Sequence, residues 1–248
     1  GNRTVTITAA DESVMTHFTM TQSGADISFA LSDLPSGVTY FHCTGSNTVS
    51  GSLAGLPSDL TDFYCDGSNT VTKGATRTWN STMDRVSLAS SASTGGLSDK
   101  DVDDLLNELA DVTTWTEEKN VTITTNQGKR SIFSDTAATA LTAALSTFTT
   151  NGRIDDIDSG TLTAGTLYRI GKTEVNHFGT GLVVGDYFVS DGTEACDANN
   201  TVLKVFAPST SGVTVVSEKE GSTQNWLTKD AGFAYNEASY RVIVREYA

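Results

Sequence analysis

One apolar pattern occurs four times between Met15 and Ala89, and it constrains the fold more than any other feature of this sequence. Each copy has apolar residues at relative positions 0, 3 and 5. The copies are Met15-Phe18-Met20, Val38-Phe41-Cys43, Leu60-Phe63-Cys65 and Met83-Val86-Leu88. Their first residues are 23, 22 and 23 positions apart. Such a period is typical of a solenoid, in which one coil cannot bury its apolar side alone and therefore stacks on the next.

The two middle copies share letters as well as spacing. Each is entered through a segment of the LPxxL type, LPSGV at residues 34–38 and LPSDL at residues 56–60. Each is followed by Gly-Ser-Asn-Thr-Val, at residues 45–49 and 67–71. These segments resemble the short bacterial type of leucine-rich repeat, although Phe and Cys replace the usual leucines and the asparagine comes one position late. The resemblance covers residues 15–90. It implies a parallel β solenoid with slightly altered corners, at which the two asparagines are expected to satisfy turn amides.

In-register stacking would bring equal positions of neighbouring coils together in the core. Phe41 and Phe63 would then stack on each other, and Cys43 and Cys65 would lie about 5 Å apart with parallel Cα–Cβ bonds. Because parallel Cβ vectors fit a disulfide poorly, both cysteines are expected to be small buried apolar residues. Cys196 is the third cysteine, and an odd number without paired spacing does not indicate a disulfide framework.

Helix and strand signals alternate after the fourth copy. Residues 98–101 form a variant of the capping box, and apolar residues at helical spacing follow as far as Val112. Residues 120–124 are predicted to form a strand. Ser134 is expected to cap a second helix, and residues 152–157 are expected to form another strand. The apolar side of that second helix would consist of Ala138, Leu141, Leu145 and Phe148.

This order predicts that the solenoid continues in longer coils to about residue 158, with helices on its convex side. A small α/β cap on the last short coil is the alternative. At the other end, the alternating residues 4–8 are expected to form a strand over the open end of the core, because a terminal repeat must cover its apolar face.

Beyond residue 158 the pattern changes to short strand-like runs separated by Gly, Asn and Asp, which predicts a separate all-β domain of residues 159–248. The runs are residues 168–170, 182–184, 187–189, 202–206, 213–216 and 240–244. Residues 161–206, with Gly-Asp-Tyr-Phe at 185–188, resemble a β module that recurs in bacteriophage virion proteins, mainly tail fibres and other surface structural proteins.

Charge and hydropathy narrow the classes of partner. The formal net charge of −14 over 248 residues argues against binding to nucleic acid or an anionic membrane, since both require a basic patch. No apolar run approaches the roughly 18 residues of a membrane-spanning helix. The six acidic residues between Asp99 and Asp111 are expected to form a solvated helix face that also interacts with the N-terminal helix dipole. A cation at Asp155, Asp156 and Asp158 is an alternative to a solvated loop.

The sequence contains no nucleophile elbow, HExxH motif, P-loop or dinucleotide fingerprint. His17, His42 and His177 have no Cys or Asp at ligand spacing. A protein without catalytic residues, metal or cofactor is therefore expected. Glycan hydrolysis is the alternative, because Asp62, Asp66 and Asp84 could share one surface and such chemistry needs two carboxylates across a cleft.

If positions 0, 3 and 5 point inward, then positions 2, 4 and 6 point outward. Read across the coils, the outward rows are His17-Tyr40-Asp62-Arg85, Thr19-His42-Tyr64-Ser87 and Thr21-Thr44-Asp66-Ala89. Tyr40, His42, Asp62, Tyr64 and Arg85 would form one cluster. Aromatic side chains beside charged hydrogen-bonding groups are typical of recognition surfaces, so these five are the predicted partner-binding residues. Ordinary cross-strand stabilisation of an exposed sheet is the alternative.

The expected fold class is α+β: a short leucine-rich-repeat-like parallel β solenoid with two helices in residues 1–158, followed by a C-terminal all-β domain in residues 159–248. The two resemblances imply a phage virion surface protein, a tail fibre or receptor-binding component, and a homotrimer in contact with other virion proteins. Its outward sheet would bind a bacterial surface glycan or protein. The alternatives are a purely structural virion protein (head decoration or fibre shaft), a secreted bacterial leucine-rich adhesin, and a glycan-degrading tail enzyme. Neither nucleic-acid binding nor membrane insertion is expected.

Overall fold

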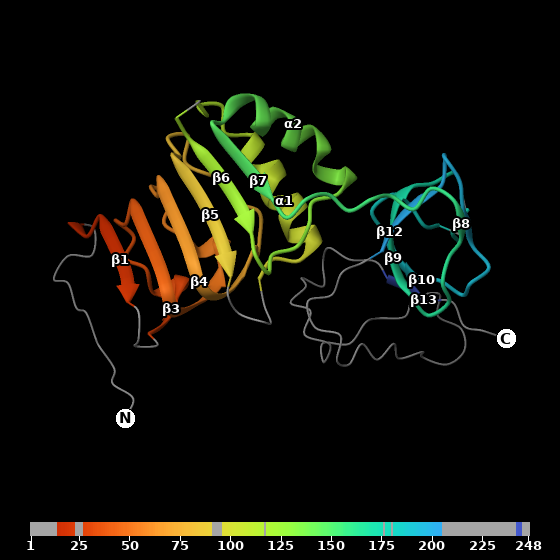
Figure 1. The fold of residues 1–248 in the computed structure, drawn as a ribbon, viewed down its shortest axis with the longest axis horizontal. Helices are drawn as coiled ribbons and strands as arrows, with labels where there is room; N and C mark the ends of the chain where they lie inside the picture. Colours follow the sequence, from red (N-terminus) through yellow and green to blue (C-terminus); the bar gives the residue numbers. More distant parts are fainter. Residues whose placement is uncertain are drawn as a thin grey trace.

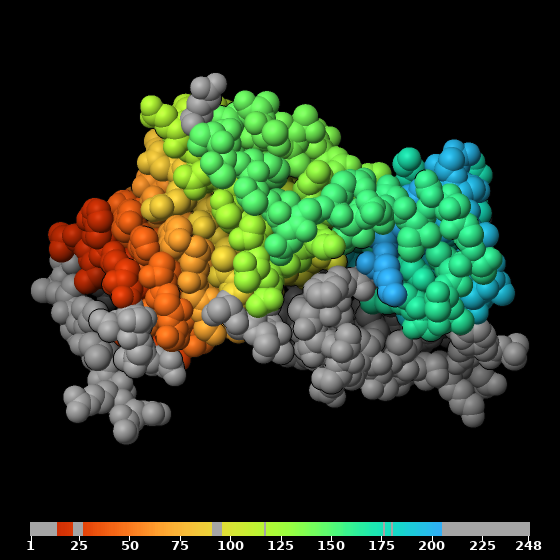
Figure 2. Space-filling view, viewed as in Figure 1, coloured from red at the N-terminus to blue at the C-terminus, as the bar shows by residue number. Residues whose placement is uncertain are grey.

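The computed structural model describes residues 14–22, 27–90, 96–116, 118–175, 177–179, 181–204 and 242–244. Within them the protein is α+β, with two α-helices and a parallel sheet of seven strands (Figure 1). The described side chains form two hydrophobic cores, one within residues 14–150 and one within residues 157–204. We call these parts the first and the second unit; the second lies at the right-hand end in Figure 2. The predicted strand at residues 4–8 lies outside the described residues.

The large sheet grows by one strand for each return of the chain. Its strands are β1 (His17–Gln22), β2 (Ser28–Ala30), β3 (Tyr40–Ser52), β4 (Asp62–Thr72), β5 (Arg85–Ser90), β6 (Asn120–Thr124) and β7 (Thr147–Thr150). They follow the order β1-β3-β4-β5-β6-β7, with β2 beside the second half of β3, and their pairings are parallel. Parallel neighbours that follow one another in sequence require the chain to come back to the same end each time. We call each such return of the chain, together with its strand, a coil.

The register of this sheet is the predicted one over the four copies of the apolar pattern. Phe41 pairs with Phe63, and Phe63 pairs with Val86. Residues at positions 0, 3 and 5 are buried in the second, third and fourth copies, whereas Met15 and Phe18 of the outermost coil are partly buried. The apolar spacing therefore predicts which side of each strand enters the core.

Strands β3 and β4 each contain a glycine, Gly45 and Gly67, at the point where the register of their pairing shifts. We call this point the corner. A Cβ on Gly67 would lie 2.9 Å from the carbonyl oxygen of Asn47, so only glycine permits this approach of the two coils. Beyond the corner the pairing shifts by two residues, and Thr48 lies opposite Ser68 rather than Thr70. Before the corner, residues at equal positions of the sequence repeat therefore lie opposite each other in β3 and β4. After the corner, they do not.

The two corner asparagines are buried, but the expectation that they satisfy turn amides is wrong. The side-chain amide of Asn69 donates to the carbonyl oxygens of Cys65 and Ala89, at 3.1 and 2.5 Å. That of Asn47 donates to the carbonyl oxygen of Thr44 at 2.8 Å. Both donate to backbone carbonyl groups where the register of the strand pairing shifts, and so provide these acceptors with a hydrogen bond.

Helix α1 (Asp99–Ala110) begins with the predicted capping box: the Ser98 hydroxyl accepts from the Asp101 amide, and the Asp101 carboxylate accepts from the Ser98 amide. Helix α2 (Asp135–Ala144) follows a short 3-10 helix at Ile132–Ser134. Ser134 occupies the N-cap position, but its hydroxyl makes no cap hydrogen bond and donates to Asp103 instead. The core of the first unit includes four side chains of α1 and two of α2: Val102, Leu105, Leu106, Leu109, Ala137 and Leu141.

The second unit contains short strands around its own core. They are β8 (Gly160–Thr161), β9 (Leu167–Lys172), β10 (Tyr187–Val189), β11 (Ala195–Cys196) and β12 (Thr201–Lys204), joined by β13 (Val242–Val244). One sheet has the order β12-β9-β10-β13, and β11 pairs with β8. The strands expected at 168–170 and 187–189 are present, as are the described parts of those at 202–206 and 240–244; residues 213–216 lie outside the described part.

Two predicted strands are wrong. Residues 182–184 form no strand, because the chain turns at residues 183–186, where the Asp186 amide donates to the Val183 carbonyl at 3.1 Å and the Val183 amide donates to the Asp186 carboxylate. Val183 and Val184 are 58% and 50% exposed. Residues 152–157 contain only isolated bridges, at Arg153 and Ile157, and the seventh strand of the large sheet is β7 instead. Leu145 and Phe148 also lie beyond α2, with Phe148 in β7. An apolar run alone could not separate a helix end from the following strand.

Candidate functional site

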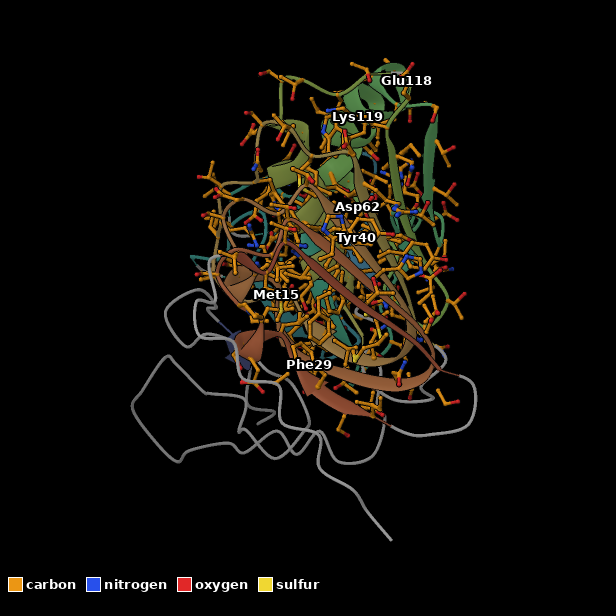
Figure 3. The ribbon with its side chains drawn as sticks, turned by 90° about the vertical axis from the view of Figure 1, so that its left-hand side faces the viewer. Met15, Phe29, Tyr40, Asp62, Glu118 and Lys119 are labelled. Atoms are coloured by element: carbon orange, nitrogen blue, oxygen red, sulfur yellow. The ribbon has the colours of Figure 1, made fainter. Side chains whose placement is uncertain are left out.

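The structure brings all five predicted partner-binding residues together on the outward face of the large sheet. Tyr40 and His42 come from β3, Asp62 and Tyr64 from β4, and Arg85 from β5. Tyr40 pairs with Asp62, and Asp62 with Arg85, while His42 pairs with Tyr64. All five are half-buried. Figure 3, which faces the N-terminal end of the stack, labels Tyr40 and Asp62 next to each other. We call these five residues the outward cluster.

The aromatic rings of the outward cluster contact one another from strand to strand, and His17 of β1 stacks on Tyr40. His42 lies 4.5 Å from Tyr64 between ring centres, and His17 of β1 lies 5.2 Å from Tyr40. The Tyr40 hydroxyl and His42 Nδ1 are 3.0 Å apart, within hydrogen-bonding distance. Equal positions on neighbouring strands are separated by about 4.8 Å, which suits ring stacking. The rings are therefore held in place before any partner arrives.

An ion pair closes the cluster on its β5 side. Arg85 Nε and Nη2 donate to one oxygen of Asp62, at 3.1 and 2.9 Å, and the guanidinium carbon lies 4.9 Å from the centre of the Tyr64 ring. Burial lowers the pKa of Arg85, but the hydrogen bond and charge of Asp62 outweigh this effect and leave it raised. Arg85 is consequently a fixed cation that stacks on an aromatic ring and binds a carboxylate at the same time.

A second carboxylate holds Tyr64 and Ser87. Asp66 accepts from the Ser87 hydroxyl at 3.3 Å. A hydrogen bond with Asp66, together with partial burial, raises the pKa of Tyr64. Tyr64 therefore keeps its phenolic proton at neutral pH and can act as a hydrogen-bond donor.

The outward rows extend further than the sequence predicted. Asn120 pairs with Arg85, and Thr122 pairs with Ser87, so β6 adds to both rows. Lys119 lies 3.4 Å from the Asp84 carboxylate. Helix α1 separates β5 from β6 and breaks the period of 22 to 23 residues, so the repeat length does not reveal that β6 continues these rows. Val121 and Ile123, both fully buried, have the spacing of positions 3 and 5, and this spacing could have revealed the continuation.

The expectation that the acidic residues of α1 form a solvated face is wrong for three of them. Asp99 accepts from the Lys129 amide at 2.6 Å, Asp103 is fully buried, and Glu108 pairs with Lys73. Loops at residues 73–79 and 127–134 cover this side of the helix. Buried carboxylates need donors, and the loop amides and hydroxyls supply them.

The three carboxylates considered for glycan hydrolysis each have a donor nearby. Asp62 binds Arg85, Asp66 binds Ser87, and Asp84 lies near Lys119. In the described part of the chain, no three His, Cys, Asp or Glu side chains are grouped so that they could hold a metal ion. Of the second acidic group, Asp156 lies 3.5 Å from Arg153.

The cysteines of the first unit behave as the spacing predicts. Cys43 and Cys65 lie opposite each other in β3 and β4, are fully buried, and are not joined in a disulfide. The hydrogen bond between them, followed by burial, raises the pKa of the Cys65 thiol. This environment keeps Cys65 protonated and unreactive.

Among the helices of the described residues, none is long and apolar enough to cross a membrane. Comparisons of the chain with protein family models, with curated proteins and with solved structures find no match. The aromatic and charged side chains of the outward cluster are therefore the structural basis for a binding role.

Proposed function

We propose that this protein is a non-enzymatic attachment protein on the surface of a bacteriophage virion, within a tail fibre or receptor-binding component. The outward cluster would bind a bacterial surface glycan or protein. One observation carries the binding role: five aromatic and charged side chains from three adjacent strands are half exposed and held together by stacking and hydrogen bonds. Tyr and Arg contribute strongly to binding energies, and a pre-ordered cluster loses little side-chain entropy on binding.

The virion part of the proposal comes from the two resemblances. We also infer a leucine-rich-repeat-like solenoid up to residue 158 and an all-β domain of residues 159–248. The parallel register at the repeat length and the short strands β8–β12 support it. We also propose a homotrimer, in contact with other virion proteins, in which several copies of a weak site act together by multivalency.

A purely structural virion role is the second candidate, and one observation favours it. The rings of the outward cluster already contact one another, and Asp62 already binds Arg85. A sheet face that satisfies its own polar groups is also well suited to packing against a sister subunit. The two candidates differ in what covers this face in the assembled particle.

The double substitution of Tyr40→Ala and Tyr64→Ala tests the proposal. Fluorescently labelled protein is incubated with a panel of intact Gram-negative and Gram-positive cells, and binding is measured by flow cytometry. We expect the wild type to bind at least one strain and the variant to lose at least about tenfold of that binding, as loss of two contact residues of a recognition surface does. Ser50→Ala with Thr70→Ala is the matched control, because this pair lies opposite in the same two strands beyond the corner.

Each outcome of this experiment decides between the candidates. Undiminished binding by the tyrosine variant, at an unchanged unfolding midpoint, would remove the outward cluster as the attachment site. If the wild type bound to none of the strains, the proposed attachment function would be contradicted. Dissociation of an oligomer by the tyrosine substitutions, measured by light scattering, would support the structural role.

A further inference from the structure

Arg169 of β9 reaches from the second unit into the first. Its Nη1 donates to Asp103 Oδ2 at 3.2 Å, across 66 positions in the sequence. The two side chains are only 12% and 1% exposed. The guanidinium carbon also lies 3.8 Å from the centre of the Phe133 ring, which belongs to the 3-10 helix before α2. One cation thus contacts both a buried carboxylate and an aromatic face of the other unit.

The position that receives Arg169 is ordered by the first unit itself. Asp103 Oδ1 accepts from the Ser131 amide at 2.7 Å and from the Ser134 hydroxyl at 2.6 Å. Asp103 Oδ2 accepts from the Ser131 hydroxyl at 2.5 Å. These bonds orient the carboxylate but supply no positive charge. A fully buried carboxylate without a cation is destabilising. Arg169 therefore supplies the positive charge that the first unit does not place beside Asp103.

The covalent connection alone does not determine how the units are oriented. Residues 151–157 are tied at their start to the first unit, because Arg153 binds the Asp135 carboxylate at 2.9 Å and the Ile154 amide donates to the Arg130 carbonyl at 2.8 Å. At their end, Ile157 pairs with Val202 of the second unit. Such a linker limits the distance between the two units but still permits one unit to rotate relative to the other. An additional contact elsewhere on the surface would restrict this rotation.

We propose that Arg169 locks the second unit against the helical side of the first, with Asp103 and Phe133 as its socket. The lock contacts α1 and the 3-10 helix before α2, not the outward cluster on β3–β5. It would thereby fix the direction in which the outward sheet points relative to the second unit, whichever partner that sheet binds. This inference does not depend on the proposed attachment function.

A distance measurement in the full chain tests the lock. Spin labels are attached at Ala140→Cys on α2 and at Val175→Cys in the second unit, both exposed positions, while the three native cysteines are buried. Pulsed electron resonance should give one narrow distance distribution for the wild type. Arg169→Ala should at least double its width. Arg85→Ala is the matched control, because it removes an arginine from an ion pair within the first unit and should leave the distribution narrow.

Further variants separate the lock from general damage. Arg169→Lys keeps the charge but loses the flat group that stacks on Phe133, so an intermediate width is expected. If Arg169→Ala does not fold, Arg169→Gln and Asp103→Asn provide a double-mutant cycle with the same readout. Coupled effects on the width support the lock. Additive effects, an unchanged width in the Arg169 variants, or a broad wild-type distribution would each overturn it.

Discussion

The rings of Phe41 and Phe63 stack in the core with their centres 5.3 Å apart and their planes 15° apart. The column continues to Phe18 of the outermost coil, whose ring centre lies 5.9 Å from that of Phe41. Each coil contributes one side chain at the same position, and the spacing of parallel strands sets their separation. The core is therefore a set of columns, and a missing side chain in the middle coil leaves a gap between ordered neighbours.

Phe63→Ala should lower the free energy of unfolding by about 3–5 kcal/mol, because it removes a fully buried ring and the coils on both sides hold the cavity open. Urea unfolding followed by circular dichroism measures this change. Thr70→Ala, at an exposed position of the same strand, should change stability by less than about 0.5 kcal/mol. A loss below about 1 kcal/mol for Phe63→Ala would contradict the stacked column.

Asn69→Ala should destabilise the protein by about 1–3 kcal/mol, because the carbonyl groups of Cys65 and Ala89 would lose a donor inside the core. Chemical unfolding provides the measurement. Asn69→Asp should be at least as harmful, since it adds a buried charge and removes the amide donor. If alanine were tolerated without loss, the amide would not be the donor at this corner.

Glu108→Gln should cost about 3–5 kcal/mol, because Lys73, only 4% exposed, would lose its anion. The same carboxylate accepts from Trp79 Nε1 at 3.2 Å, so indole fluorescence should shift as well. Lys73→Met in the Glu108→Gln background should recover much of the loss by removing the isolated charge. Lys100→Met is the control, because its pair with Asp104 is more exposed and should contribute less than about 1 kcal/mol.

Asp135 should make stability depend on pH in the acid range. The hydrogen bond from Arg153, opposed by burial and reinforced by Arg130, lowers the pKa of Asp135 below its ordinary 3.8. A lowered folded-state pKa contributes stability that is present above the unfolded-state pKa and is lost as pH falls through the folded-state value. The difference in stability between wild type and Asp135→Asn should therefore shrink between about pH 5 and pH 2.

Salt provides an independent check on that pH prediction. The Asp135 and Arg153 side chains are 40% and 29% exposed, so salt ions can screen their attraction. About 1 M salt should therefore reduce the stability difference between wild type and Asp135→Asn at neutral pH. A difference that is constant across the acid range, measured by thermal unfolding at a series of pH values, would show that these arginines do not stabilise the charged form of Asp135.

The outward cluster could be predicted because the residue spacing within each strand determines which side chains face outward. A strand turns every second side chain to the same side, so the apolar spacing of each copy also determines which residues face outward. The repeat length then aligns Tyr40 with Asp62 and His42 with Tyr64. This reasoning failed where the chain leaves the period: the corner at Gly67 shifts the pairing by two residues, and α1 delays the continuation through Asn120.

The amphipathic pattern of α1 was sufficient by itself to determine that Val102, Leu105, Leu106 and Leu109 are core residues, and all four are fully buried. It could not determine that Asp103 would be buried with them. That outcome depends on Ser131 and Ser134 at the later 3-10 helix and on Arg169 in the second unit, and no spacing within α1 encodes their positions. Apolar burial follows from periodicity along one element, whereas burial of a charge requires donors from distant segments, which meet only once the chain has folded.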